Sequence, residues 1–95
     1  MRLKTSSEAE RDIYEIHEFG SLNYGTDQAD RYVDALRGMF DFLARFPLVA
    51  RERANMRPPV RLYPYGAHNV IYRVDDNELL IVRVLHHSAD WKDWL

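Results

Sequence analysis

Hydrophobic residues in the first half of the chain recur with the period of an α-helix. In residues 7–20 they stand three or four positions apart and are separated by charged residues, as in an amphipathic helix; they are Ala9, Ile13, Ile16 and Phe19. Capping-box patterns begin at both Thr5 and Ser7, so the helix is predicted to start within residues 5–7. It is predicted to end between Gly20 and Gly25.

A second stretch with the same period follows directly. Thr26 and Asp27 are both suitable N-cap residues. The apolar stripe that follows them consists of Ala29, Tyr32, Val33, Leu36, Phe40 and Leu43. Pro47 ends this helix, because proline has no backbone N–H and disfavours helical geometry in the residue before it. Two helices with so short a connection are expected to pack as an antiparallel hairpin.

After an arginine-rich loop at 48–59, the period changes from helical to alternating. Strands are predicted at 60–63, 68–74 and 78–87, and residues 2–4 are a candidate edge strand. In the last strand, alternation puts Leu80, Val82 and Val84 on one face and Leu79, Ile81, Arg83 and Leu85 on the other. Because both faces are apolar, this strand is expected to be central, with the helices covering one face.

The order βααβββ predicts an α+β fold, in which an antiparallel helical hairpin packs on a small, mostly antiparallel sheet. The 95 residues suit one domain spanning 1–95. The absence of cysteine excludes disulfides, thiolate metal sites and a thiol nucleophile. No apolar run follows the N-terminus, and the longest one, residues 79–82, is too short to cross a bilayer. A cytoplasmic protein without membrane association is therefore expected.

The small net charge of −2 hides a segregated distribution. Residues 1–44 contain five basic and nine acidic side chains, residues 45–73 contain six arginines and one glutamate, and residues 74–95 contain two basic and five acidic groups. The basic middle segment has two interpretations: it neutralises the acidic flanks within the fold, or it meets an acidic partner or a nucleic acid.

Several residues are candidates for chemistry. His86 and His87 are adjacent on a predicted strand, so they are expected on opposite faces, and no metal site is predicted. Arg61, Arg83, His86 and His87 together with Tyr72 are a candidate acid–base set for RNA cleavage. The chain has only two lysines and no glycine-rich phosphate loop. Trp91 and Trp94 either fold back onto the sheet or offer an exposed anchor to a partner.

Five segments of the chain resemble the RelE/ParE superfamily of toxins, on the ParE side. They are Ser7-x-Ala9-x-x-Asp12-Ile13-x-x-Ile16, Ala29-x-x-Tyr32-x-x-Ala35-Leu36, Phe46-Pro47, Val70-Ile71-Tyr72-Arg73-Val74, and Ile81-Val82-Arg83-Val84-Leu85-His86 followed by Asp90. Two positions depart from the pattern. Ala50 stands where the family often has glycine, and Asn69 stands where some RNA-cleaving relatives have arginine.

The resemblance implies the toxin of a type II toxin–antitoxin module that stabilises a plasmid or chromosomal region. It implies inhibition of growth by poisoning DNA gyrase, without enzymatic activity or cofactor, and neutralisation by a ParD-like antitoxin. The alternative is a ribosome-dependent mRNA endonuclease of the RelE type, with Arg61, Arg83, His86 and His87 as its catalytic residues. A fold that has lost its toxicity is a third possibility.

Two sets of binding residues follow from combining the charge pattern with the resemblance. An acidic antitoxin segment that folds on binding is expected to meet the arginine-rich stretch, at Arg51, Arg53, Arg57 and Arg61. The candidates for contacting the target are Arg83, His86, Trp91 and Trp94. No sequence-specific binding of nucleic acid is expected.

Overall fold

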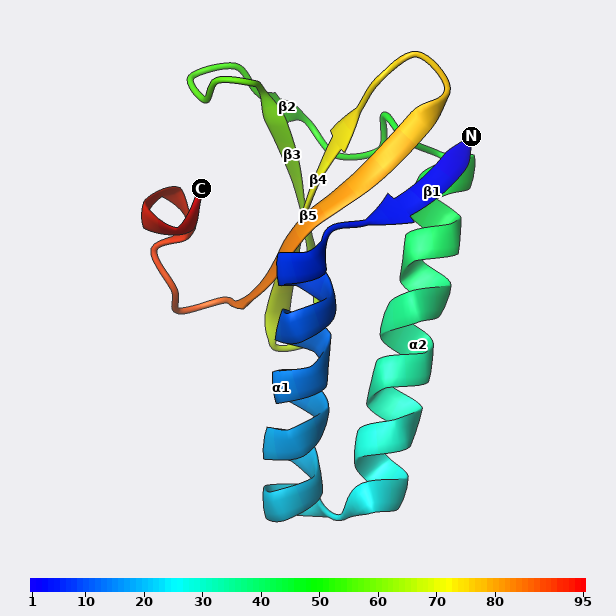
Figure 1. Cartoon of the computed structure of the whole chain (residues 1–95), viewed down its shortest axis with the longest axis vertical. Coiled ribbons are helices and arrows are strands. Elements are labelled where there is room, and N and C mark those ends of the chain that lie inside the picture. The colour runs from blue at the N-terminus through cyan, green and yellow to red at the C-terminus, as the bar shows by residue number, and fades with distance from the viewer.

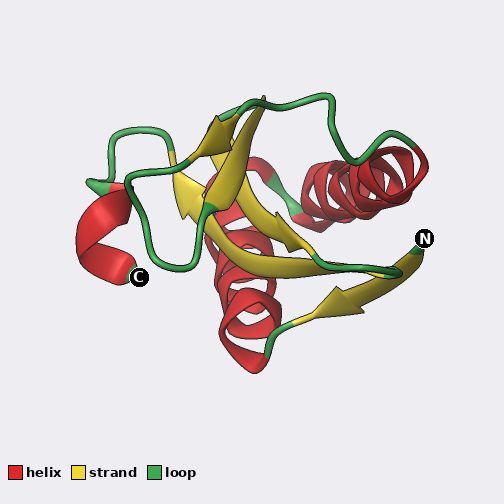
Figure 2. Ribbon diagram, turned by 90° about the horizontal axis from the view of Figure 1, so that it is seen from above, coloured by secondary structure: helices red, strands yellow, loops and turns green.

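The computed structural model describes residues 1–95, which form a five-stranded sheet with two helices on one face (Figures 1 and 2). The elements in chain order are β1 (Arg2–Thr5), α1 (Ser7–Tyr24), α2 (Thr26–Arg45), β2 (Glu52–Arg53), β3 (Val60–Tyr65), β4 (His68–Val74), β5 (Glu78–His86) and a 3₁₀ helix, η1 (Trp91–Trp94). The strand order across the sheet is β1-β5-β4-β3-β2. The predicted α+β fold with a helical hairpin is confirmed, with the two-residue β2 as an addition.

The sheet is antiparallel except at one edge. β1 runs parallel to β5, with Arg2 opposite Glu78 and Thr5 opposite Ile81, while β5, β4, β3 and β2 form antiparallel pairs. β5 therefore has a strand on each side, as its apolar sequence predicted.

Ser6 defines the start of α1. Its hydroxyl oxygen accepts a hydrogen bond from the Ala9 N–H at 3.0 Å and donates one to the Val82 carbonyl of β5 at 2.7 Å. Both predicted capping boxes were wrong by one residue, because this contact with the sheet selects Ser6 as the N-cap. The two helices are separated by Gly25 alone, whose φ of 92° lies in the region that only glycine adopts freely.

The main core fills the space between the helices and the sheet. Its largest fully buried side chains include Phe40 and Leu36 of α2 and Tyr72 of β4. The Tyr72 hydroxyl donates a hydrogen bond to the Pro47 carbonyl at 2.9 Å. This bond satisfies a buried polar group and fixes the start of the loop that follows α2.

A β-bulge in β5 changes which residues face the helices. Ile71 is opposite Arg83 and Tyr72 is opposite Ile81, so Val82 is an extra residue in β5. Val84 therefore shares the helix-facing core with Ile81, whereas Leu85 lies on the other face. The predicted face assignment was wrong beyond the bulge, because one inserted residue reverses the alternation.

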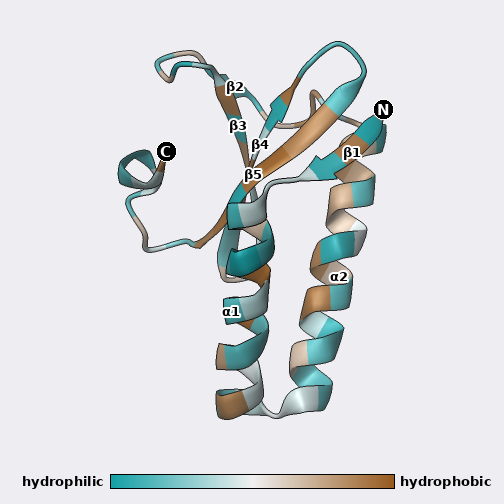
Figure 3. Ribbon diagram, viewed as in Figure 1, coloured by the Kyte–Doolittle hydropathy of each residue, from teal (hydrophilic) through white to brown (hydrophobic).

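The face of the sheet away from the helices carries a second, smaller core. Val60, Ile71 and Leu85 form its centre, and Met56, Val82, Ala89 and Trp91 pack around them. The C-terminal segment thus folds back onto the sheet. Figure 3 shows further apolar residues at the free end of the helical hairpin, where Phe19 and Leu22 are exposed.

Candidate functional site

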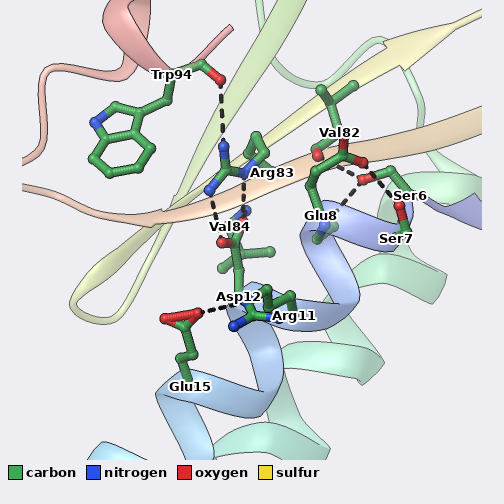
Figure 4. A network of polar contacts seen from close by, with 11 residues as sticks. Ser6, Ser7, Glu8, Arg11, Asp12, Glu15, Val82, Arg83, Val84 and Trp94 are labelled. Carbon is green, nitrogen blue, oxygen red and sulfur yellow. Dashed lines mark hydrogen bonds and ion pairs between the residues drawn. The ribbon is translucent and has the colours of Figure 1, made fainter.

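Arg83, at the centre of β5, is fully engaged within the fold. Its Nε and Nη2 donate hydrogen bonds to the two carboxylate oxygens of Asp12, each at 2.8 Å, and its Nη1 donates to the Trp94 carbonyl at 3.3 Å (Figure 4). Asp12 also accepts a hydrogen bond from the Val84 N–H at 2.9 Å. The hydrogen bonds that Arg83 donates to Asp12 raise the pKa of Arg83 above its ordinary value. Arg83 therefore joins α1, β5 and the C-terminal helix.

Arg61 is engaged as well. Its Nη1 donates a hydrogen bond to the Ala50 carbonyl at 2.6 Å, and its Nη2 lies 3.9 Å from a carboxylate oxygen of Glu52. Only 17% of its side chain is exposed. Arg61 thus holds the loop between α2 and β3.

Three residues of the candidate nuclease set lie near one another, because Arg83 and His86 line one pocket and the rings of His86 and His87 are adjacent, whereas Arg61 lies apart from them. Arg61 is opposite Tyr72, and His86 is opposite His68, four positions further along β4. Four residues of strand span roughly 13 Å. Arg83 is opposite Ile71 of the outer core, whereas Arg61 is opposite a residue of the helix-facing core. This arrangement offers no common point at which a substrate meets all of them.

His86 and His87 do not point to opposite faces, so that prediction was wrong. Their ring centroids are 4.3 Å apart with an interplanar angle of 31°. The reason is that β5 ends at His86, so strand alternation does not extend to His87. His86 Nδ1 lies 2.6 Å from the Ser88 hydroxyl oxygen. No group of three or more His, Cys, Asp or Glu side chains in the chain is placed to hold a metal ion.

Tyr32 and His68 form a polar centre that the sequence analysis missed. The Tyr32 hydroxyl donates to the Tyr65 carbonyl at 3.2 Å, accepts from the Ala67 N–H at 3.1 Å and lies 2.7 Å from His68 Nδ1. Burial lowers the pKa of His68, with a smaller contribution from His86, and burial raises the pKa of Tyr32. The only sequence signal for this centre was the hydroxyl group of Tyr32, since the other residues of the α2 stripe have no polar side-chain atom.

This centre closes one end of a pocket of about 360 Å³ between the helices and the β3–β4 turn. Ile16, Phe19, Tyr24 and Ala29 provide apolar walls, and Tyr32, His68 and His86 form the polar end; this set comes from both helices, β4 and β5. Such a pocket suits an apolar side chain of a partner with a polar group beside it.

The other predicted binding residues occupy the opposite end of the sheet and the C-terminal segment. Arg51 and Arg57 are exposed and Arg53 is half-buried, and none of their three side chains makes a hydrogen bond or ion pair within the chain. Trp91 is half-buried in the outer core, and Trp94 is 55% exposed with its ring centroid 5.4 Å from the Arg83 guanidinium carbon. Neither helix combines the length and the apolar composition that a membrane-spanning segment needs.

The sequence profile described as "ParE toxin of type II toxin-antitoxin system, parDE" matches residues 3–91. The chain belongs to this ParE toxin family. A curated relative, Toxin ParE3 from Caulobacter vibrioides, is 29% identical over 63 residues, which span 66% of this chain and 63% of the relative. The fold matches a solved structure described as "Chromosomal ParDE TA system from P. aeruginosa", with a TM-score of 0.77 and 22% identity, over 90% of this chain and 95% of the other.

Membership of the ParE family confirms the resemblance found in the sequence. Nothing in the geometry favours the RelE-type alternative, because Arg61 and Arg83 are held by partners within the fold and are separated across the sheet. What the surface offers is a set of free arginines, exposed aromatic residues and an apolar pocket. These features suit the binding of a partner.

Proposed function

We propose that this ParE family member inhibits growth by poisoning DNA gyrase and that a ParD-like antitoxin neutralises it by direct binding. The family match over residues 3–91 carries this proposal. The engaged state of Arg61 and Arg83 supports action by binding, because neither guanidinium is free to stabilise a phosphorane.

The antitoxin surface in this proposal is the arginine-rich end of the sheet. Arg51, Arg53 and Arg57 are free to form bidentate bonds with acidic side chains of the antitoxin. Arg61 contributes by holding the Ala50 carbonyl, which positions the loop that bears the other three. An apolar side chain elsewhere in the antitoxin segment occupies the pocket beside Tyr32.

The target surface in this proposal is the C-terminal end of β5 with the C-terminal helix, which borders the loop of Arg57 at a shared pocket. His86 and Trp94 are exposed and contact gyrase directly. Arg83 and Trp91 position them, because Arg83 binds the Trp94 carbonyl and Trp91 anchors the segment in the outer core.

Gyrase poisoning is tested with the purified chain, gyrase and relaxed plasmid. We expect loss of supercoiling and accumulation of linear DNA, and we expect Trp94→Ala to weaken both effects while the same variant stays folded. Primer extension on cellular mRNA after induction is the counter-test. Codon-linked cuts in mRNA, with gyrase unaffected, overturn the proposal in favour of the RelE-type activity.

Antitoxin binding is tested by reversing charge. The triple variant Arg51→Glu, Arg53→Glu, Arg57→Glu is expected to bind the cognate antitoxin at least about tenfold more weakly, since several charge-assisted hydrogen bonds are lost. Arg31→Glu is the matched control, because Arg31 is an exposed arginine of α2 outside this surface. Equal affinities of the triple variant and the control overturn the assignment of this surface.

A further inference from the structure

Arg73 on β4 and Arg53 on β2 differ from the other arginines of the chain. Each of the others is either exposed or bound to an acidic or carbonyl group within the fold. The side chains of Arg73 and Arg53 are half-buried, make no hydrogen bond or ion pair, and each has a fully buried Nε without a partner. Removing a cation from water without a counter-charge is unfavourable. Arg73 also lines a small cavity with Glu52 and Asp75, but neither carboxylate forms an ion pair with it, so its guanidinium is available to an anion from outside the chain.

A pocket of about 250 Å³ lies next to Arg73 on the face of the sheet away from the helices. Arg57 also lines this pocket, as do Ser6 and Glu8 from the N-terminal end of α1. Figure 4 shows how α1, the Val82–Arg83 segment of β5 and Trp94 come together at this face. The pocket is thus built from five separate parts of the chain.

The charges that line the pocket favour an anion. Arg57 and Arg73 carry free positive charge, the charge of Arg83 is compensated by Asp12, and Glu8 is the one acidic side chain in the lining. The N-terminal end of an 18-residue helix adds a positive partial charge on the same side. Guanidinium forks match the oxygen geometry of phosphate.

We propose that this pocket is a phosphate-binding site, with Arg73 and Arg57 as its two cationic ligands. The volume of the pocket exceeds what one inorganic phosphate fills. Val82 and Trp94 form an apolar and aromatic wall of the same pocket. The ligand class is therefore a phosphate monoester of a small organic molecule. This site goes beyond the proposed function and does not depend on it.

The test is a titration of the purified full chain with inorganic phosphate and, separately, with glycerol phosphate, at constant ionic strength set with sodium chloride. Binding is followed by the arginine Nε–Hε signals in nitrogen-proton NMR spectra and by the midpoint of thermal unfolding. We expect saturable shifts and a rise in the midpoint with both probes. Tighter binding of glycerol phosphate than of inorganic phosphate identifies the organic monoester as the ligand source, and the reverse order identifies free phosphate.

Substitutions of the residues that line the pocket test whether phosphate binds there. Arg73→Gln is expected to weaken phosphate binding at least about tenfold, since it removes charge-assisted hydrogen bonds. Glu8→Gln is expected to strengthen it about threefold, because an exposed like charge is removed. Arg31→Gln is the control and is expected to bind as the parent does. If Arg73→Gln fails to fold, Arg57→Gln in the exposed loop gives the same test.

Two results overturn the proposal. The first is equal phosphate binding by the parent, Arg73→Gln and Arg57→Gln. The second is an equal effect of sodium acetate at the same ionic strength, because a site built for phosphate prefers the dianion with its additional acceptor oxygens to a carboxylate.

Discussion

Asp12 and Arg83 are 71 residues apart in the sequence and form a bidentate pair, with two N–O distances of 2.8 Å. Their side chains are only 12% and 16% exposed, respectively. The Val84 N–H adds a third donor to the same carboxylate, at the point where the bulge leaves β5 irregular. The pair therefore holds α1 against the sheet at its least regular position.

Replacement of Asp12 by Asn is expected to lower the free energy of unfolding by about 3 kcal/mol, because it leaves the Arg83 charge largely buried without a counter-charge. Chemical denaturation measures the change. Glu15→Gln is the matched control, since it breaks the exposed Arg11–Glu15 pair of α1, whose N–O distance is 3.3 Å; we expect a change below about 0.5 kcal/mol. Similar values for both variants contradict the prediction.

Two glycine substitutions are expected to act in opposite directions. Gly66 has φ of 55°, and a Cβ at this position lies 2.6 Å from the Tyr32 hydroxyl oxygen, so Gly66→Ala strains the backbone and displaces the hydroxyl. A loss of about 2 kcal/mol is expected. Gly38→Ala in α2 meets nothing within 4 Å and is expected to stabilise by about 0.5–1 kcal/mol. Thermal unfolding of both variants measures the effects, and equal signs contradict the prediction.

The stability of the fold is expected to decrease in mildly acidic solution because of His68. Its pKa is lowered in the folded chain, first by burial and then by His86 and His87. The unfolded chain therefore takes up a proton near pH 6.5, the ordinary value for histidine, while the folded chain does not. The free energy of unfolding is at its full value above this pH and falls as the pH drops through it.

Urea unfolding between pH 5.5 and 7.5 measures this dependence, and His68→Gln is expected to reduce it. The His68 ring is also followed directly by NMR. His87→Gln is expected to move the pKa of His68 upward, because one of the neighbouring positive charges is removed. Titration of the His68 ring at or above the pKa of histidine in the unfolded chain contradicts the prediction.

The two C-terminal tryptophans are expected to differ in their effect on stability. Trp91 packs against the outer core, so Trp91→Ala is expected to cost about 2 kcal/mol. Trp94 is 55% exposed and contributes mainly its contact with Arg83, so Trp94→Ala is expected to cost less than about 1 kcal/mol. Denaturation curves distinguish the two. A larger loss for Trp94→Ala would show that the segment is anchored by its last turn instead.

The sequence predicted the elements whose signals are local. The helices followed from their apolar period, and α2 begins at Thr26 and ends just before Phe46-Pro47. Its N-cap, however, is Gly25 and neither Thr26 nor Asp27, so the predicted N-cap was wrong. The antiparallel strands followed from the alternation of apolar and polar residues. The exact N-cap of α1 could not be predicted from the local sequence. The Ser6 hydroxyl is selected because it binds the Val82 carbonyl of a strand 76 residues away.

The parts that sequence patterns failed to predict depend on contacts between distant segments. The bulge at Val82 leaves no trace in composition, yet it decides the face on which Val84 and Leu85 lie. In the same way, the sequence made Arg83 a candidate catalytic residue of a nuclease. The folded structure shows instead that its guanidinium pairs with Asp12. Tyr32 looked like a core residue, although its hydroxyl organises the β3–β4 turn.

The parallel pairing of β1 with β5 has a consequence for the order of events during synthesis. β1 is the first element to be made, and its partner residues 78–81 come from the last fifth of the chain. Until they are available, β1 is unpaired, the Ser6 hydroxyl lacks the Val82 carbonyl, and Asp12 lacks Arg83. Contacts of such long sequence separation form late and slowly. A prematurely terminated translation product that lacks β5 therefore lacks the strand that joins β1 to the rest of the sheet, so aborted synthesis is expected to yield no folded toxin.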